Sequence, residues 1–316
     1  MGLYIGVDVG GTKVLAAEVT ADGVVRRTAR RSTPGRRIDA ALVETALTEA
    51  VFEVADGRTI DGVGLAAAGF VDAAGARVAF APHLPWRGED VRGRLTQRWG
   101  TPVALDNDAN CAALAECTHG AAQDTCEVLL VTMGTGIGGA LVLDGRIHRG
   151  TQGMAGEFGH MKVVPDGQPC ECGGRGCWEQ YSSGNALVRF ARDRIGQDPT
   201  VLEQLCGGNP DLLTGPMVTE AAEDGDLVAR QAFASVGGWL GVGLANLVAA
   251  FDPELIVVGG GVSAAGDRLL EPARTALTRS LVGTGHREIP PVVRAAFGPA
   301  AGVVGAAELI RSQARR

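Results

Sequence analysis

Two stretches of this chain, far apart in the sequence, share one design. Residues 4–25 (YIGVDVGGTKVLAAEVTADGVV) and 128–150 (VLLVTMGTGIGGALVLDGRIHRG) each run from alternating apolar residues through a glycine turn into more alternation. Such a pattern predicts a β-hairpin. Because alternating helical and strand patterns follow each hairpin, we expect two related α/β lobes with a cleft between them.

Further strands and helices are expected after each hairpin. Residues 39–55 predict a helix, residues 62–72 a buried strand that runs into a loop, and residues 102–120 a strand, an acidic turn and a helix. In the second half, residues 254–277 predict a strand, a triple-glycine turn and a helix, and residues 301–313 a closing helix. Folds of this class bind ligands at the carboxyl ends of their strands. The residues expected at those ends are Asp8, Asn107, Asp108, Thr135 and Gly260.

The composition argues against some classes of partner. With 316 residues, the chain is long enough for two domains with proper cores. Its formal net charge of -7 argues against a nucleic-acid partner, which requires a basic face. The chain runs from Met1 straight into the first strand without a secretory pattern, so we expect a cytoplasmic protein.

Residues 232–251 resemble a membrane span in length. Twenty residues there carry no charge, which is enough to cross a bilayer. The segment contains Ser235 and Asn246, however, and runs at once into the strand pattern DPELIVVGGG. A long buried helix that leads into a buried strand explains it better, so no membrane partner is expected.

The glycine turns are candidates for phosphate binding. The first, GVDVGGTK, lacks the G-x-G-x-x-G spacing of dinucleotide folds and turns into a second strand rather than a helix, and it is not a Walker A loop. Its glycine amides and the Thr12 hydroxyl can still cradle phosphate oxygens. A plain hairpin turn explains one loop equally well, but two such loops and the glycines at 259–261 favour phosphate binding.

Six motifs resemble, in their order, those of the ROK-family sugar kinases and repressors: DVGGTK, LDNDAN, GTGIGG, GEFGH, CECGGRGCWE and DPELIVVGGG. The resemblance runs from residue 3 to about residue 310, and within the family it is greatest to the zinc-containing bacterial glucokinases. The family's repressors carry a helix-turn-helix before the first strand. Here that strand starts at about residue 3, so the resemblance implies an enzyme.

The resemblance implies an α/β fold of the two-lobed, actin-like ATPase (ribonuclease H-like) type. The implied smaller lobe comprises residues 1–117 and 302–316. The larger lobe comprises residues 118–301, with a zinc-binding loop at 160–177. Because the family is often dimeric or tetrameric, we expect a homodimer or a homotetramer.

A metal site is expected in residues 157–180, which gather three cysteines and a histidine among glycines and acids. Cys170, Cys172 and Cys177 have the close spacing of a metal knuckle, and His160 supplies a fourth ligand for a structural, tetrahedral Zn²⁺. The family binds zinc through the corresponding positions. Disulfides are disfavoured in the cytosol, and seven cysteines are an odd number. Merely buried or redox-active cysteines are the alternative.

Carboxylates and amides that grip adjacent hydroxyls are the groups that recognise a sugar. The residues that match the family's sugar site are Asn107, Asp108, Glu157, His160 and Glu179, with Gly69 as a looser match. Asp108 matches the catalytic base, which accepts the proton of the sugar 6-hydroxyl as that oxygen attacks the γ-phosphorus of ATP. From the residues alone, a role as helix N-cap explains the Asp and Asn residues of LDNDAN as well as catalysis does. Asp106 is expected to be the cap or a supporting group.

The phosphates of ATP are expected to lie on the glycine turns, with Asp8 helping to hold Mg²⁺, in part through water. The residues expected to contact the nucleotide are Asp8, Gly10, Gly11, Thr12, Lys13, Thr135, Gly136, Gly260 and Gly261. The implied activity is the phosphorylation of glucose by ATP, with Mg²⁺ and a structural Zn²⁺.

Alternative functions keep parts of this interpretation. Another hexose, such as N-acetylmannosamine or fructose, would change the substrate but not the chemistry. A polyphosphate donor would favour a more basic channel than this acidic chain offers. A non-catalytic sugar sensor would retain the sugar site, but Asp108 and the glycine turns argue against it.

Overall fold

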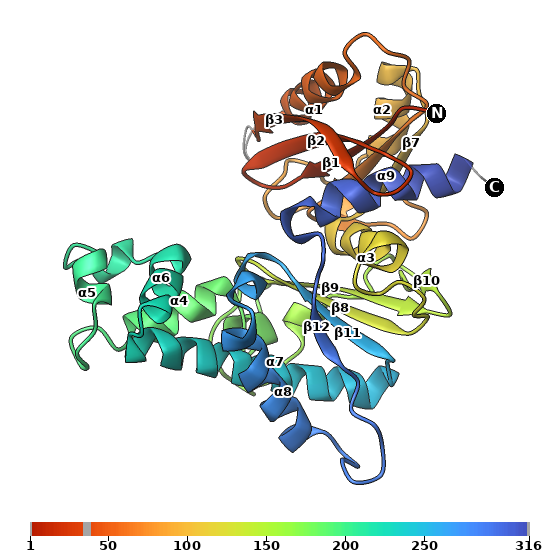
Figure 1. The fold of residues 1–316 in the computed structure, drawn as a ribbon. Helices are drawn as coiled ribbons and strands as arrows, with labels where there is room; N and C mark the ends of the chain where they lie inside the picture. The colour runs from red at the N-terminus through yellow and green to blue at the C-terminus, as the bar shows by residue number, and fades with distance from the viewer. Residues whose placement is uncertain (1, 34–38, 315–316) are drawn as a thin grey trace. The chain divides into compact units, whose positions relative to one another are not determined.

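The computed structural model describes residues 2–33 and 39–314, and Figure 1 shows its fold. Contacts divide the chain into two compact units, and each is described on its own. Unit 1 comprises Met1–Cys126, Ala140–Gly156 and Ala296–Arg316, and unit 2 comprises Glu127–Gly139 and Glu157–Ala295. Three stretches that the sequence assigned to the larger lobe group with unit 1 here: 118–126, 140–156 and 296–301.

A five-stranded sheet forms the centre of unit 1, in the order β3-β2-β1-β4-β7. Its strands are β1 (Tyr4–Val9), β2 (Lys13–Val19), β3 (Val25–Ser32), β4 (Gly62–Ala67) and β7 (Val103–Asn107). β1 pairs antiparallel with β2 from Val9 and Val14 onward, so the first expected hairpin is confirmed. β4 and β7 extend the sheet in parallel, which brings the carboxyl ends of β1, β4 and β7 to the same edge.

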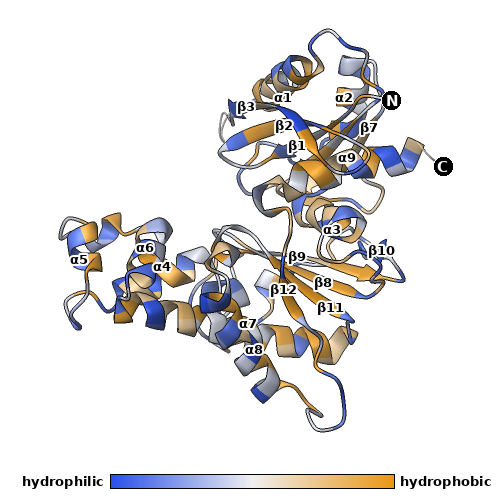
Figure 2. Cartoon of the chain, in the orientation of Figure 1, coloured by the Kyte–Doolittle hydropathy of each residue, from blue (hydrophilic) through white to orange (hydrophobic). Residues whose placement is uncertain are grey.

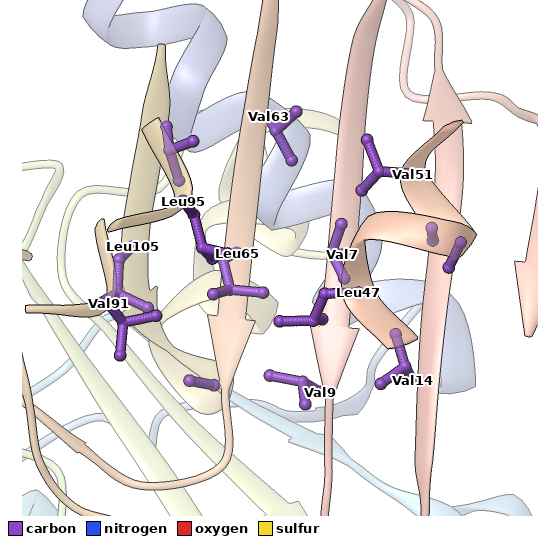
Figure 3. Close-up of a cluster of buried hydrophobic side chains, with 14 of the residues drawn as sticks. Val7, Val9, Val14, Leu47, Val51, Val63, Leu65, Val91, Leu95 and Leu105 are labelled. Atoms are coloured by element: carbon purple, nitrogen blue, oxygen red, sulfur yellow. The ribbon is translucent and has the colours of Figure 1, made fainter. Parts of the chain in front are cut away.

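One face of this sheet packs against helices in an apolar core. Other elements of unit 1 include α1 (Ala40–Ala55), β5 (Phe70–Val71), β6 (Val78–Phe80), α2 (Val91–Trp99), α3 (Asp108–His119), η5 (Gly298–Ala300) and α9 (Ala301–Ala314). Figure 3 shows Val7 and Val9 of β1 beside Leu65 of β4 and Leu47 of α1, and all four are buried. Alternate strand residues thus reach the helices, as the alternation in the sequence predicts.

Paired glycines let α9 lie directly on the other face of the sheet. Gly6 of β1 and Gly64 of β4 are partners in the register. A Cβ atom at Gly6 would lie 1.8 Å from the carbonyl oxygen of Val303, and one at Gly64 would lie 1.7 Å from that of Ala306. Any side chain at either position would push α9 off the sheet. Figure 1 shows the C-terminal α9 beside the N-terminal strands.

The second sheet has the strand order β10-β9-β8-β11-β12. Its strands are β8 (Val128–Met133), β9 (Ile137–Leu143), β10 (Arg146–Ile147), β11 (Leu255–Gly259) and β12 (Val292–Arg294). The Gly134 amide donates to the Gly136 carbonyl at 3.0 Å and closes the turn between β8 and β9, so the second expected hairpin is confirmed. The unit boundary runs through β9, because residues from Ala140 onward group with unit 1.

The helices of unit 2 include the long apolar helix that the sequence predicts. They are η1 (Phe158–His160), η2 (Trp178–Gln180), α4 (Gly184–Arg192), α5 (Leu202–Leu205), η3 (Pro210–Leu212), α6 (Gly215–Glu223), α7 (Leu227–Phe251), η4 (Gly261–Ala265) and α8 (Asp267–Ser280). By length and composition alone, α7 is apolar enough to cross a membrane, and 61% of its most apolar stretch is buried inside the protein. Figure 2 shows β8 and β11 as strongly apolar elements of the same region.

The glycines of α7 serve helix packing. A Cβ atom at Gly241 would lie 2.2 Å from the carbonyl oxygen of Ala273 in α8, and one at Gly237 would lie 2.6 Å from that of Leu269. The two helices therefore meet backbone against backbone, and contact with α8 explains the Gly-x-x-x-Gly spacing in α7.

Candidate active site

The first glycine turn of unit 1 is tightly built. The Gly10 amide donates to the Lys13 carbonyl at 3.0 Å, and the Thr33 hydroxyl donates to the Gly10 carbonyl at 2.7 Å. Gly11 lies against His83, since a Cβ atom at Gly11 would be 2.4 Å from the His83 Cβ. Thr12 and Lys13 are exposed at the tip. The turn therefore presents backbone amides, a hydroxyl and an ammonium group from one fixed loop.

Asp8 stands at the end of β1, beside the start of α9. A Cβ atom at Gly302 would lie 3.0 Å from the Asp8 carboxylate carbon, so a larger residue there would crowd that carboxylate. Burial raises the pKa of the Asp8 carboxyl above its ordinary value, although the Lys13 charge lowers it in part. A partly buried carboxylate of this kind gains from a cation beside it.

The end of β7 carries the next pair of expected site residues. Asn107 is the N-cap of α3, and its side-chain oxygen accepts from the Ala109 amide at 2.8 Å. Its side-chain nitrogen donates to the Gly69 carbonyl at 3.1 Å, so the structure brings Asn107 and Gly69 together. Asp108 is half-buried as the first residue of α3. The cap is therefore Asn107, and of the two roles expected for Asp106, the cap is wrong and the supporting role remains, since its carboxylate accepts from the Asn107 amide at 2.8 Å.

Asp106 has a partner that the sequence did not reveal. Its carboxylate, almost fully buried, accepts from Nε of Arg149 at 2.8 Å and also from Nη2. The two residues are 43 positions apart, and no motif links them. Sequence patterns report local structure, so this ion pair was missed.

Unit 2 holds a cavity of about 580 Å³ beside the second glycine turn. Thr135, Asn185 and Gly261 are among its lining residues. Gly260 has φ +81°, and a Cβ atom there would lie 2.4 Å from the Met133 carbonyl oxygen, so glycine alone lets the triple-glycine turn meet the end of β8. Both glycine turns of unit 2 thus line the cavity. Residues of both turns are expected to contact the nucleotide.

Three cysteines and a histidine of unit 2 come together in one cluster. The ligand atoms of His160, Cys170, Cys172 and Cys177 all lie within 4.8 Å of one another. The sulfur atoms of Cys172 and Cys177 are 3.6 Å apart, and the Cys170 sulfur is 3.8 Å from Nδ1 of His160. Ligand atoms of a tetrahedral zinc, about 2.0–2.3 Å from the metal, are about 3.5–3.8 Å from one another. The donor set and its spacing therefore fit Zn²⁺.

Glycines and main-chain bonds shape this knuckle. The Cys170 amide donates to the Gly174 carbonyl at 2.9 Å, and Gly173 and Gly176 have φ angles of +87° and +75°. Burial raises the pKa of the Cys170 thiol, whereas a backbone hydrogen bond from Gly174 lowers the pKa of the Cys172 thiol. Metal binding requires thiolates, so binding of a metal here would release the protons of these thiols.

Two carboxylates flank the cluster. Oε1 of Glu179 lies 3.7 Å from Nδ1 of His160 and accepts from the Cys170 thiol at 3.1 Å. Oε2 of Glu157 lies 3.9 Å from the other ring nitrogen, Nε2. Burial raises the pKa of the Glu157 carboxyl, the nearby His160 lowers it and Glu179 raises it further. His160 therefore turns one nitrogen to the cysteines and the other to Glu157.

The second glycine turn reaches the same place. A Cβ atom at Gly136 would lie 2.3 Å from Oε2 of Glu179, so this glycine allows the turn to lie against the carboxylate. Unit 2 thus brings together residues expected to bind sugar, nucleotide and metal: Gly136, Glu157, His160, Glu179 and the three cysteines. Unit 1 brings together Gly69, Asn107 and Asp108.

Comparisons with known proteins show the family of this chain. The model of the ROK family matches residues 4–313. The chain is 42% identical over 314 residues to a glucokinase of Streptomyces coelicolor, and the match covers 98% of each chain. Two solved structures are also similar. A ROK family glucokinase of Streptomyces griseus in complex with glucose and AMPPNP has 44% identity and a TM-score of 0.90, with 98% of this chain and 100% of that chain covered.

A ROK hexokinase of Thermus thermophilus has 33% identity and a TM-score of 0.77, with 99% of each chain covered. Both similarities extend over nearly the whole chain. The expected α/β fold of the actin-like ATPase type is therefore confirmed.

Proposed function

This chain belongs to the ROK family, and from that premise we propose that it transfers the γ-phosphoryl group of ATP to the 6-hydroxyl of glucose. The observation that carries the proposal is the full-length similarity to a structure that holds glucose and AMPPNP, an analogue of ATP. The identity of 42% to a glucokinase of Streptomyces coelicolor supports the same substrates.

The side chains proposed to bind glucose form two groups, one in each unit. Asn107 and Asp108 come from the end of β7, where Asn107 also holds the Gly69 loop. Glu157 is the N-cap of η1, His160 is its last residue, and Glu179 lies in η2 after the knuckle. Carboxylates and ring nitrogens in fixed positions can each bind one or two sugar hydroxyls, which gives orientation as well as affinity.

Asp108 is the proposed general base. Asn107 is the N-cap of α3, and Oδ1 of Asp108 also accepts from the Ala109 amide at 3.0 Å, which orients its carboxylate. Asp108 accepts the proton of the sugar 6-hydroxyl while that oxygen attacks the γ-phosphorus, and ADP leaves. Phosphoryl transfer depends mainly on positioning and electrostatic stabilisation, so a single oriented carboxylate serves.

The residues proposed to bind the nucleotide lie on the three glycine turns. The cavity of about 580 Å³, lined in part by Thr135 and Gly261, offers a place for the nucleoside. The turn of unit 1 offers its amides, Thr12 and Lys13 to the phosphates. Asp8 would hold Mg²⁺, directly or through water, and that ion would supply charge neutralisation on the phosphate oxygens.

Zn²⁺ is the proposed metal of the Cys/His cluster, with three sulfur ligands and Nδ1 of His160. Four protein ligands leave no position for a water, so the zinc is structural. It would fix the ring of His160 and leave Nε2, beside Glu157, for a sugar hydroxyl. Sugar binding is thereby linked to an intact metal site.

The location and the assembly of the enzyme are also proposals. We place it in the cytoplasm, where ATP is supplied, and propose a homodimer or homotetramer. Size-exclusion chromatography with light scattering would give the mass of the assembly directly.

The decisive assay follows glucose-dependent ADP release from ATP·Mg²⁺, with mannose, fructose and N-acetylmannosamine in parallel. We expect the highest kcat/KM on glucose. Asp108→Asn should lower kcat by about 100–10,000-fold, while glucose binding measured by calorimetry persists.

Each other outcome has a definite meaning. Preference for another sugar would keep the mechanism and change the substrate. Folded, zinc-loaded protein that binds glucose but releases no ADP would overturn the kinase proposal in favour of a sensor. An Asp108→Asn variant with normal kcat would remove Asp108 from its role as the base.

A further inference from the structure

A buried ion pair supports the turn that carries the proposed base. Asp106 is 3% exposed and uses both carboxylate oxygens. Oδ1 accepts from the Asn107 amide at 2.8 Å and from Nδ2 of Asn110 at 2.9 Å. Oδ2 accepts from Nε of Arg149 at 2.8 Å and from Nη2. One oxygen thus holds the start of α3, and the other holds Arg149.

Arg149 begins a closed loop in unit 1. Its carbonyl accepts from the Ala155 amide at 3.1 Å, which joins the two ends of the loop. Within the loop, Gly153 has φ +83°, and a Cβ atom there would lie 2.0 Å from the Val71 carbonyl oxygen. The loop is therefore anchored at its tip by contact with β5 and at its base by the bond to Asp106.

The same loop leads to the sugar-binding segment. Only Gly156 separates Ala155 from Glu157, and two residues of chain reach at most about 7 Å. The position of Glu157 is therefore limited by the loop that Arg149 holds. Arg149 is connected through Asp106 to Asn107 and Asp108, and through its own loop to Glu157.

We propose that Arg149 is a positioning residue for the phosphoryl transfer. Its two-point ion pair with Asp106 orients the end of β7 and holds the loop that precedes Glu157. The inference rests on the proposed function and adds a residue to it. A planar guanidinium that binds through two nitrogens fixes an orientation, which a lysine with a single ammonium group does not. Misplacement of reacting groups by about 1 Å can cost about 100-fold in rate.

A purely structural ion pair would behave differently. Replacing both partners of a buried pair together costs less stability than removing one partner, which leaves an uncompensated charge. The double variant Asp106→Asn with Arg149→Met therefore separates the two roles. It removes both charges together, so its fold should survive, but it also removes the two-point geometry.

The experiment compares three full-length, zinc-loaded variants with the wild type. They are Arg149→Lys, the double variant, and Arg94→Lys as a matched control. Arg94 binds Glu44 through Nε at 3.0 Å and Nη2 at 2.6 Å, between α1 and α2, which carry none of the site residues. For each we would measure Tm, kcat, and the KM values for glucose and ATP.

We expect Arg149→Lys to lower kcat by about 10–100-fold and to raise the glucose KM, with the ATP KM within about twofold of the wild type. The double variant should keep a Tm near that of the wild type and remain slow, and Arg94→Lys should be unchanged in kcat. Wild-type kinetics of Arg149→Lys, or full activity of the double variant, would overturn the inference. If Arg149→Lys does not fold, the double variant decides alone.

The failure of the proposed function is visible separately. A wild-type enzyme that does not phosphorylate glucose would overturn that function, and the positioning role with it. An active wild type with insensitive variants would overturn the positioning role only.

Discussion

Asp8 places a carboxylate where burial disfavours its charge. Burial raises its pKa, and the nearby Lys13 compensates only in part. The native state therefore binds the Asp8 proton more tightly than the unfolded chain does. This contribution to stability is neutral below the unfolded pKa of about 4 and becomes unfavourable as the pH rises through the raised native pKa. A bound cation would stabilise the charged form of Asp8 and offset this cost.

Asp8→Asn should therefore stabilise the protein while it removes activity. Without ligands, we expect its Tm at pH 7 to exceed that of the wild type by about 2–4 °C, and the difference to vanish below about pH 4. The rate with ATP·Mg²⁺ should fall by about 100-fold, because the ligand for the ion is lost. Thermal scans across pH and the ADP-release assay check both parts.

Asp22→Asn is the matched control for this pair of measurements. Asp22 is exposed, and the hydroxyl of Thr20 holds the pKa of its carboxyl below the ordinary value. Its amide variant should gain no stability at pH 7. A Tm for Asp8→Asn equal to or below that of the wild type would show that the buried charge of Asp8 does not destabilise the protein.

At the scale of the elements, the carboxylate of Glu116 ties α3 to two connecting segments. It is fully buried, and Oε2 accepts from the Ala121 amide at 2.9 Å and from the Ala296 amide at 3.0 Å. Oε1 accepts from the Phe297 amide at 3.0 Å. Gly120 makes room, since a Cβ atom there would lie 2.3 Å from Oε2. The same carboxylate thus binds both the segment that follows α3 and the segment that begins at Ala296.

Glu116→Gln should lower the free energy of unfolding by about 2–3 kcal/mol. One carboxylate oxygen becomes an NH₂ group, which faces a main-chain donor instead of accepting from it. Urea denaturation would measure the loss, with the exposed Glu49→Gln on α1 as a control that should change by less than about 0.5 kcal/mol. Equal stability of the two variants would mean that these three bonds contribute little.

At the scale of the whole molecule, the Cys/His cluster brings together residues from two segments of the chain. His160 comes from η1, and the three cysteines come from the loop before η2. Glu157 and Glu179 lie just outside the cluster, each within 4 Å of a ring nitrogen of His160. Zinc binding is therefore expected to contribute both to folding of this region and to the sugar site.

Cys172→Ala should lose zinc and sugar affinity together. We expect less than one zinc per chain by elemental analysis, and a glucose Kd raised by about 10-fold or more. Cys126→Ala, an exposed cysteine outside the cluster, should keep both properties. If zinc is lost while the glucose Kd stays the same, the metal does not support the sugar site. If zinc is kept, the ligand set is wrong.

Much of the fold was predictable because its signals are local. Both hairpins, the helices α1, α3 and α9, and the long α7 follow from alternation, glycine turns and helical periodicity over a few residues. The cysteine knuckle is local as well, and the structure brings its expected ligands together. The roles proposed for the site residues, and the boundaries of the lobes, stay predictions.

The sequence by itself determined the order of strands and turns, the residues at the strand ends and the family. Only the tertiary structure decided which distant groups meet them. Arg149 forms an ion pair with Asp106, 43 positions away in the sequence. Glu116 accepts a hydrogen bond from the Ala296 amide, 180 positions away. The glycine at position 6 has a reason only once α9 lies against it. Charge pairing and close backbone contact depend on positions in space, and no periodic pattern along a chain records them.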